Sequence, residues 1–544
     1  MNLWATKSIA TLRAEADQAG EHQLKRALTP LNLITLGIGA IIGAGIFVLT
    51  GQAAAQYAGP AVWISMILVG IACAFAGLCY AEMASAVPVA GSAYTYSYAT
   101  MGELVAWIIG WDLVLEYAAG AATVGVGWSG HFVSLLGNFG LKLPAGLTAA
   151  PTTWCTAANV QAAIAGCAHT GLNLTGAIIN LPAVFVVAVM STILVIGIKE
   201  SAKVNNFIVL LKLTIIFLIV AVGLTHITSA NWKPLIPPNT GEWGTYGISG
   251  ILRGAGLVFF AYIGFDAVST AAQEARNPQK DMPIGILGSL FVCTLLYVIV
   301  SALLTGMVNY KELLALQTSS PPDYAAPMAY AMKHVGAPEW VRISVDVGAV
   351  LGLGSVILVM LLGQSRVFYS MSRDGLLGGW AGRVHPKFRT PYLSTIYTGI
   401  AVGLATGLLP LQLLGQLVNI GTLLAFVLVC AGVWILRKKR PDLDRPFRTP
   451  WVPFVPIAGV VCCLGLMATL PADTWIRLIV WLLIGFTIYF GYSRKHSRLQ
   501  RELGGAGGPP PSMGGGGGVG REASRRAGNT LSSTGAERKH DQRS

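Results

Sequence analysis

Long apolar runs recur along this chain and restrict what it can fold into. Most of them reach roughly 20 residues, the length that an α-helix needs to cross the hydrocarbon core of a bilayer. Because no water is present there, a spanning backbone must satisfy its own hydrogen bonds. Only 11% of the residues are charged, about half of the share usual in a soluble protein. The sequence therefore excludes a soluble multidomain protein and predicts an all-α integral membrane protein.

The apolar runs predict about twelve membrane-spanning helices. Two longer loops, 138–175 and 309–340, are expected on the outer side, and the second is expected to form a short helix between Tyr324 and His334. The predicted spans are 32–50, 60–87, 104–137, 176–198, 205–226, 250–274, 284–308, 343–372, 392–410, 412–436, 452–470 and 474–493.

The net charge of +13 is distributed unevenly between the two sides of the predicted topology. About 28 of the 37 Lys and Arg residues fall in segments on one side, which by the positive-inside rule is the cytoplasm. Both termini are then cytoplasmic and the protein is multi-pass in a bacterial inner membrane, with the lipid bilayer rather than nucleic acid as its partner. Residues 1–30 lack the apolar segment of a signal peptide, so the first span is expected to stay uncleaved.

Four glycines crowd the first predicted span: Gly37, Gly39, Gly43 and Gly45. Glycine is costly inside a helix because it loosens the backbone. One explanation is close packing against neighbouring helices through small residues. The other is a helix broken near Gly43 to Gly45, whose freed N–H and C=O groups bind a zwitterion in mid-membrane.

The sixth predicted span contains a matching irregularity. Gly254 and Gly256 precede a run in which Gly264 is followed closely by Asp266. A carboxylate this deep in an apolar run is expensive unless it meets freed backbone amides or water. Two glycine-interrupted helices five spans apart are typical of a transporter built from inverted repeats.

Several motifs resemble one family of membrane transporters. They are the glycine run from Gly37 to Phe47, the stretch from Tyr80 to Tyr96, the segment from Phe259 to Pro283, and Tyr369-Ser-Met-Ser-Arg-Asp-Gly-Leu-Leu. Residues 28–495 as a whole are similar to the amino acid–polyamine–organocation superfamily, and most of all to bacterial members of its cationic amino acid transporter family. The segment from Phe259 to Pro283 is the most specific of these motifs.

The resemblance implies a five-plus-five inverted-repeat (LeuT-like) core followed by two accessory helices. It leaves the two ends outside, so the chain divides into a cytoplasmic N-terminal segment (1–30), the transporter core (31–436), a basic loop with the accessory helices (437–495) and a cytoplasmic tail (496–544). The glycine- and proline-rich composition of that tail predicts that it is disordered. The resemblance also implies that the substrate carboxylate is bound around Ile41, Ile42, Gly43, Ala44 and Gly45, and the amino group and side chain around Phe260, Ala261 and Ile263.

Ionisable residues inside the spans are functional candidates because burying them is expensive. Glu116 lies near the bilayer centre of the third span with Asp112 one turn earlier, either as part of the substrate pocket or as a structural hydrogen-bonding group. Lys212, in the fifth span, either extends to the interface or is a buried ammonium that releases and regains a proton. The resemblance favours a substrate-pocket or gating role for Glu116 and proton coupling by Lys212, and leaves Asp112 undecided. A gating or structural role is expected for Asp266 and Glu82.

The family's eighth-span motif places Met360 in the side-chain pocket, where transporters of cations tend to have a small polar residue. A methionine offers no acceptor to a guanidinium or ammonium group. We therefore expect a proton-coupled, sodium-independent permease for neutral amino acids, with a uniporter or exchanger of arginine and lysine as the alternative.

Other classes of function fit the sequence less well. No nucleophile–base pair or metal-ligand cluster recurs in the spans, so neither an enzyme nor a cofactor or metal is expected. A channel would show no saturation, and a receptor would need a folded signalling tail. Cys155 and Cys167 lie in the outer loop of an oxidising compartment, and we expect them to form a structural disulfide.

Overall fold

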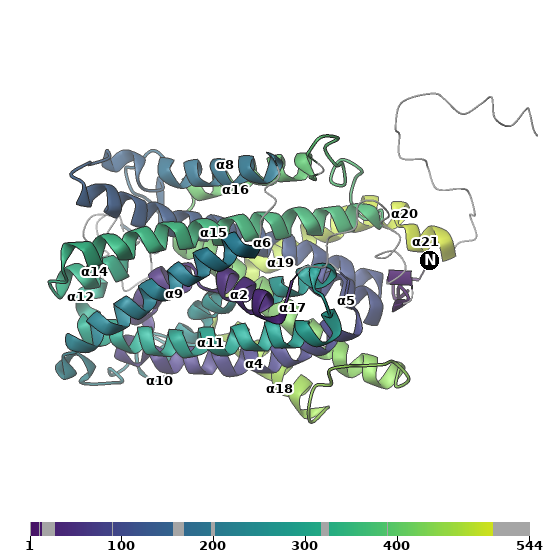
Figure 1. Cartoon of the computed structure of the whole chain (residues 1–544), viewed down its shortest axis with the longest axis horizontal. Coiled ribbons are helices and arrows are strands. Elements are labelled where there is room, and N and C mark those ends of the chain that lie inside the picture. Colours follow the sequence, from purple (N-terminus) through teal and green to yellow (C-terminus); the bar gives the residue numbers. More distant parts are fainter. Residues whose placement is uncertain are drawn as a thin grey trace, which may run out of the picture.

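The computed structural model consists mainly of helices that run along one long axis (Figure 1). It describes residues 2–9, 11–12, 28–89, 91–155, 168–196, 202–316, 326–388 and 390–503. Cys167, Tyr324 and the glycine-rich tail from 504 onward lie outside the described residues.

The first half of the chain holds a broken first span, a long second helix and a long third helix. Its elements are α2 (Pro30–Ile41), η2 (Gly45–Leu49), α3 (Thr50–Ala53), η3 (Ala54–Ala58), η4 (Gly59–Ala61), α4 (Val62–Ala86), α5 (Ser92–Thr100), α6 (Glu103–Asn138), η5 (Ala145–Leu147), β1 (Thr152–Cys155), β2 (Gly171–Leu174), α8 (Leu181–Ile196), α9 (Ala202–Thr225) and η6 (Ser229–Trp232).

The second half begins with another broken span and ends in a pair of apolar helices. Its elements are α10 (Gly247–Val258), η7 (Phe259–Tyr262), η8 (Asp266–Glu274), α11 (Pro278–Met307), α12 (Tyr310–Ala315), α14 (Pro327–His334), α15 (Glu339–Arg373), α16 (Tyr392–Leu408), α17 (Leu411–Lys439), α18 (Phe454–Thr469), α19 (Ala472–Ile488), η9 (Tyr489–Ser493), α20 (Arg494–His496) and α21 (Arg498–Leu503).

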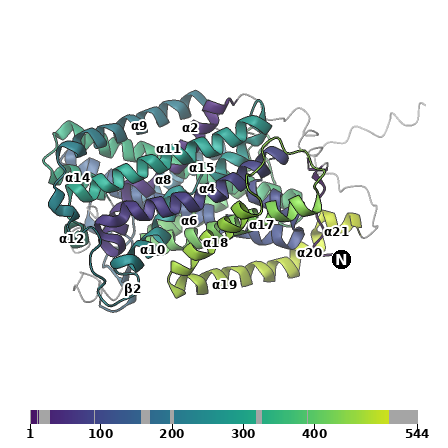
Figure 2. The same cartoon turned by 90° about the horizontal axis from the view of Figure 1, so that it is seen from below.

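Each predicted span overlaps a helix or a run of two or three helical segments. Within the described residues, eight helical stretches are long and apolar enough to cross a membrane, and four further apolar helices are shorter: α2, α8, α16 and α18. The protein is therefore a multi-pass membrane protein. α6 packs along α15 and α4 along α11, while α18 and α19 lie on the outside of the bundle (Figure 2).

Close packing between α6 and α15 depends on glycines. A Cβ added to Gly120 would lie 3.6 Å from Sδ of Met360, and one added to Gly363 would lie 3.2 Å from the Tyr117 ring. Small residues let two helix backbones approach in this way. The resulting van der Waals contacts hold the helices together in lipid, where the hydrophobic effect does not drive their association.

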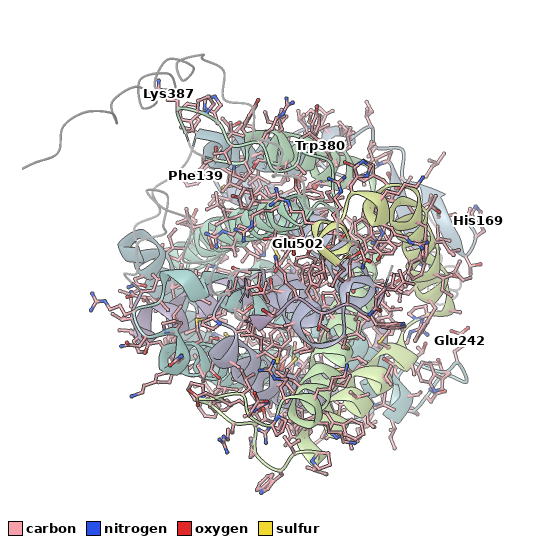
Figure 3. The ribbon with its side chains drawn as sticks, turned by 90° about the vertical axis from the view of Figure 1, so that its right-hand side faces the viewer. Phe139, His169, Glu242, Trp380, Lys387 and Glu502 are labelled. Atoms are coloured by element: carbon pink, nitrogen blue, oxygen red, sulfur yellow. The ribbon has the colours of Figure 1, made fainter. Side chains whose placement is uncertain are left out.

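The first and last described residues meet at one end of the bundle, which faces the viewer in Figure 3 and carries Glu502. The Asn2 backbone N–H donates to Oε1 of Gln500 at 3.2 Å, and Nζ of Lys7 donates to Oδ1 of Asp374 at 2.9 Å. The two described ends of the chain therefore lie on the same side, as the charge distribution predicts for the termini.

Besides an isolated bridge between Leu28 and Ala275, the β-structure of the described residues lies in the loop between α6 and α8. β1 and β2 form a small antiparallel sheet in which Thr152 pairs with Leu174 and Cys155 with Gly171. An open two-stranded sheet has unpaired edges, so it is tolerated outside the hydrocarbon, where water can satisfy them. The chain is otherwise mostly helical, as predicted, and the sequence analysis did not anticipate this sheet.

Candidate functional site

The first span is broken at the position that its glycines predict. α2 ends at Ile41, the capping residue Ile42 has extended backbone angles (φ −72°, ψ 101°), and helix resumes at Gly45 as a π-helical turn. The helix is interrupted between Ile41 and Gly45. The last carbonyls of α2 and the first N–H groups of the second half-helix are therefore left without intrahelical partners.

Both explanations of the glycine run find support. A Cβ on Gly37 would overlap Oγ of Ser289 on α11, which is packing through a small residue. Gly43 and Gly45 lie at the break, and there too an added Cβ would crowd neighbouring side chains. Close packing and the broken helix therefore act together at the break.

The sixth span is broken in the same manner. The helical segment α10–η7 ends at Tyr262, Ile263 is extended (φ −63°, ψ 135°), and Gly264 has φ +119°, a conformation that favours glycine. The freed N–H of Gly264 donates to Oδ1 of Asp266 at 3.2 Å. As the sequence predicts, the buried Asp266 carboxylate meets a freed backbone amide.

The two breaks contact each other directly. A Cβ on Gly45 would overlap the Cβ of Ala261, and one on Gly264 would lie 2.9 Å from the carbonyl carbon of Ala40. The unwound parts of the first and sixth spans thus approach as closely as glycine allows.

Two residues that the sequence analysis did not select hold these breaks. The Tyr297 hydroxyl of α11 lies 2.8 Å from the Ile41 carbonyl and 2.7 Å from that of Ala261. It has one proton, so it donates to one break at a time. Nδ2 of Asn419 on α17 donates to the carbonyls of Gly256 and Leu257, at 2.8 and 3.0 Å. Asn419 could have been selected from the sequence, because a strongly polar side chain inside an apolar span is costly. Tyr297 could not, because a tyrosine in such a span is ordinary.

Lys212 is bound to the broken first span. Its Nζ donates to the carbonyls of Gly39 at 2.9 Å and Ile42 at 3.0 Å, and its side chain is 1% exposed. The alternative in which Lys212 extends to the interface is therefore wrong. An ammonium here satisfies the orphan carbonyls at the end of α2 and complements the partial negative charge of that helix end.

Glu116 and Asp112 are both buried on α6, facing α17. Oε1 of Glu116 and both oxygens of Asp112 find no hydrogen-bond partner in the described part of the chain. The Thr422 hydroxyl faces Glu116, and a Cβ on Gly421 would lie 2.7 Å from Oδ1 of Asp112. An acceptor left open in this way is available to a polar ligand, and leaving it empty is costly.

Replacing Glu116 with glutamine tests whether this carboxylate serves the transport cycle. The amide keeps the shape and loses the charge, so a hydrogen bond worth about 1.5–3 kcal/mol is weakened, and uptake is expected to fall roughly ten- to hundredfold. The matched control is Glu339→Gln, an exposed acid at the start of α15. Uptake kinetics equal to those of the parent protein would assign Glu116 a purely structural role.

Met360 lies on the face of α15 that borders the first break. Val356, one turn earlier, would be 3.0 Å from a Cβ on Gly43, and Met360 is buried against Gly120 of α6. The structure thus brings Met360 and the first break along one face of α15.

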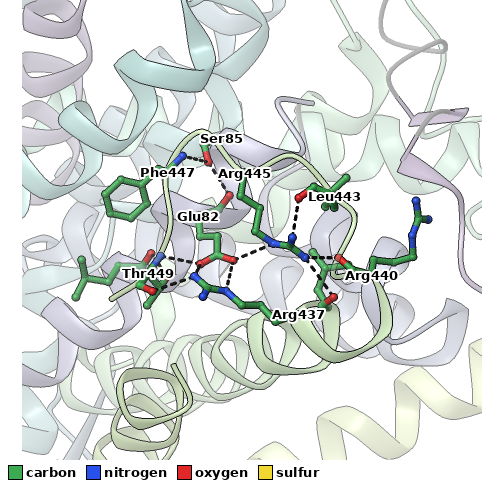
Figure 4. A network of polar contacts seen from close by, with 10 residues as sticks. Glu82, Ser85, Arg437, Arg440, Leu443, Arg445, Phe447 and Thr449 are labelled. Atoms are coloured by element: carbon green, nitrogen blue, oxygen red, sulfur yellow. Dashed lines mark hydrogen bonds and ion pairs between the residues drawn. The ribbon is translucent and has the colours of Figure 1, made fainter. Parts of the chain in front are cut away.

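Glu82 lies away from the breaks in a network of charged residues (Figure 4). Its carboxylate accepts two hydrogen bonds from Arg437 at 3.0 and 2.7 Å, one from the Thr449 N–H at 2.8 Å, and forms an ion pair with Arg445 at 3.3 Å. These contacts tie α4 to α17 and to the segment that follows it. Of the two roles expected for Glu82, the geometry favours the structural one.

The cysteines divide between the outer loop and the helices. Cys155 is disulfide-bonded, and the six free cysteines lie in the helical segments: Cys73, Cys79, Cys293, Cys430, Cys462 and Cys463. Since Cys167 lies outside the described residues, its pairing with Cys155 stays a prediction.

Comparisons with known proteins agree with this architecture. The family model described as amino acid permease matches residues 28–489. The chain is 47% identical to the branched-chain amino acid permease BcaP of Bacillus subtilis, over 92% of this chain and 99% of the relative. It is 44% identical to the methylthioribose transporter of the same organism, over 92% and 100% of the two chains. The vacuolar cationic amino acid transporter 4 of Arabidopsis thaliana is 33% identical, over 78% and 65%.

A family model that covers most of the chain and relatives matched over nearly their whole length point to one assignment. Together with two touching helix breaks inside a helical membrane bundle, they show that the chain belongs to the amino acid permease family of the amino acid–polyamine–organocation superfamily.

Proposed function

We propose that this chain imports neutral amino acids across a bacterial inner membrane, each together with a proton and without sodium. The observation that carries the proposal is Lys212, whose ammonium is held on two carbonyls at the break of the first span. The core would be the five-plus-five repeat that the resemblance implies, followed by two accessory helices to make about twelve spans, with cytoplasmic termini.

The two breaks offer the groups that a zwitterion needs. N–H groups at Gly43 to Gly45 begin the outer half-helix, and its dipole favours the substrate carboxylate. Carbonyls of η7 next to Ala261 favour the amino group. Because the breaks are in contact, both charged ends of one small molecule can be bound at the same time.

Lys212 supports proton coupling through its position. A fixed cation on the Gly39 and Ile42 carbonyls occupies oxygens that a sodium ion would otherwise need. When the amine loses its proton, its hydrogen bonds to the carbonyls at the end of α2 weaken, because a neutral donor forms a weaker hydrogen bond than a charged one. Protonation of Lys212 therefore controls how firmly α2 is held, and α2 borders the substrate site.

The substrate class is inferred from Met360 and from the relatives. The thioether of Met360 provides no acceptor for a second positive charge, and burying one without a partner is expensive. The relative at 47% identity is a branched-chain amino acid permease. We favour alanine and branched aliphatic amino acids. The uniporter or exchanger of arginine and lysine is not favoured.

Changing Met360 to serine is expected to shift selectivity toward cationic amino acids. The smaller hydroxyl side chain leaves room and supplies an acceptor, so the ratio of arginine to leucine affinity should rise roughly tenfold, one hydrogen bond of about 1–1.5 kcal/mol. Met467→Ser on α18, also a buried methionine, is the control. An unchanged ratio in both variants would show that selectivity is set by other residues.

The deciding experiment is uptake by purified protein in liposomes. Labelled amino acids are supplied with an imposed inward proton gradient or a sodium gradient, and unlabelled compounds compete. Saturable accumulation of neutral amino acids driven by protons alone supports the proposal. Better competition by arginine or by methylthioribose than by any neutral amino acid would overturn the substrate class, and sodium dependence would overturn the coupling.

A further inference from the structure

A buried histidine–aspartate pair joins α6 and α15 in the half of the bundle beyond the breaks. Nδ1 of His131 lies 3.0 Å from Oδ1 of Asp346, with the two side chains 0% and 1% exposed. The other carboxylate oxygen accepts hydrogen bonds from Oγ of Ser134 at 2.9 Å and Nδ2 of Asn138 at 3.1 Å. The substrate site and Lys212 do not use these groups.

The carboxylate fixes which nitrogen of His131 carries a proton. An ionised carboxylate accepts hydrogen bonds only, so Nδ1 must be the donor toward Asp346. Nε2 of a neutral ring is then a basic lone pair. That atom is buried and has no partner within the described ranges. A buried, unpartnered acceptor on a histidine is poised to bind a proton.

The His131 ring borders the outer half of the broken first span. Phe47 contacts the His131 ring edge-on, with centroids 5.9 Å apart, and Gly127 would place a Cβ 3.0 Å from Val48. Gln52 follows Val48 by one turn on the same face. Its amide oxygen and nitrogen are also buried and unpartnered in the described structure.

We propose that His131 is a second proton-binding site, separate from Lys212, that senses the pH of the outer solution. The proton comes from water at the outer end of α6, where Ser134 and Asn138 are partly exposed, and binds the lone pair of Nε2, because Nδ1 already donates its own proton to Asp346. Imidazolium and carboxylate then form an ion pair, and the Nε2–H gains the Gln52 amide as an acceptor. The proton leaves by the same route.

Protonation would thereby join the first span, α6 and α15 at the outer side of the substrate site. An acidic exterior favours the protonated state, in which these three elements are joined. A less acidic exterior favours the neutral ring and separates them. The inference rests on the chain being a transporter, as proposed above, but it does not rest on Lys212 carrying the coupling proton.

Other charged groups near the pair lie on the same helices or at their ends. Arg342 is one turn outward of Asp346 on α15. Lys212 contacts Gly352, six residues or about 9 Å further inward. The segments 30–58, α8 and α16 contribute no Asp, Glu, Lys, Arg or His. The remaining charged residues on α6, α14, α15, α9 and α17 are Glu103, Asp112, Glu116, Lys333, His334, Glu339, Arg366, Arg373, Lys203, Arg437, Lys438 and Lys439. The tyrosines of α6, α14, α15 and α16 are Tyr117, Tyr330, Tyr369, Tyr392 and Tyr397.

The direct test is the side-chain ¹⁵N NMR spectrum of the full-length protein in nanodiscs, with labelled histidine and a pH titration. One titrating signal should disappear in His131→Gln and shift in Asp346→Asn. It should stay in His226→Gln, the control at the exposed outer end of α9. If every titrating histidine signal of the parent protein persists in His131→Gln, or if no signal of the parent titrates, the proposal is overturned.

The functional test is uptake at fixed inner pH with outer pH varied, using protein of one orientation. His131→Gln is expected to keep proton-driven accumulation, with its outer-pH midpoint moved by roughly one unit or more. His226→Gln should match the parent. An unchanged profile in His131→Gln would refute outer pH sensing while leaving the transport function standing. No amino-acid uptake by the parent would refute that function and leave the NMR result to decide His131.

Discussion

Replacing Lys212 with alanine is expected to abolish accumulation of amino acid driven by a proton gradient. With one proton per substrate, a gradient of one pH unit (about 1.4 kcal/mol) supports at most tenfold accumulation. The variant removes the ammonium that bonds the Gly39 and Ile42 carbonyls, so no proton is exchanged at the break. The ratio of inner to outer substrate should fall to about one in liposome uptake assays.

The control separates coupling from folding. Lys233→Ala removes an exposed lysine from the loop after α9 and should accumulate substrate like the parent. Thermal unfolding of Lys212→Ala with and without substrate checks that the protein still folds and binds. If Lys212→Ala accumulates substrate against a gradient and responds to pH as before, the proton is carried elsewhere, with His131 and Glu116 the next candidates.

The sequence predicted the breaks because their cost is visible in single residues. Glycines such as Gly43 and Gly264 weaken a helix, and Asp266 is too expensive in hydrocarbon unless backbone amides are free to meet it. Both signals are local, so they do not depend on knowing the fold. The structure then places the breaks at Ile42 and Ile263, within a residue or two of those glycines.

Contacts between distant parts of the chain were not predictable in the same way. Tyr297 joins the two breaks through one hydroxyl, but its sequence neighbourhood is an ordinary apolar run. The pairing of His131 with Asp346 connects residues 215 positions apart. In the sequence, each of the two residues is a single polar group within an apolar span. Their pairing becomes visible only when α6 and α15 are packed together. The small sheet in the outer loop was missed because short strands carry little periodic signal.

The function of a residue also depends on what it faces. Lys212 and Glu116 were both selected because they are ionisable and deep in a span. The structure separates them: Lys212 has two carbonyl partners, while Oε1 of Glu116 has none in the described residues. The contacts of Lys212 suit a group that binds the protein's own backbone. The open acceptor of Glu116 suits a group that binds a ligand. Burial alone could not have distinguished them.

Gly45→Ala is expected to reduce uptake about as strongly as loss of a binding residue. The new Cβ would overlap the Cβ of Ala261, where the first and sixth spans meet. Overpacking of this kind costs about 1–3 kcal/mol and shifts backbone, which corresponds to a loss of substrate affinity of roughly ten- to hundredfold. Binding measured by thermal shift and transport measured in liposomes should both weaken.

Gly465→Ala is the matched control, because this glycine of α18 has nothing within 4 Å of the added Cβ. The second check is a rescue. Ala261→Gly removes the atom that Gly45→Ala would strike, so the double variant should regain part of the lost affinity, as neighbouring residues are expected to be non-additive. Full recovery is not expected, since the Ala261 backbone also lies close to the new Cβ. If Gly45→Ala transports like the parent, or if the two changes add without interaction, the two breaks do not form one site.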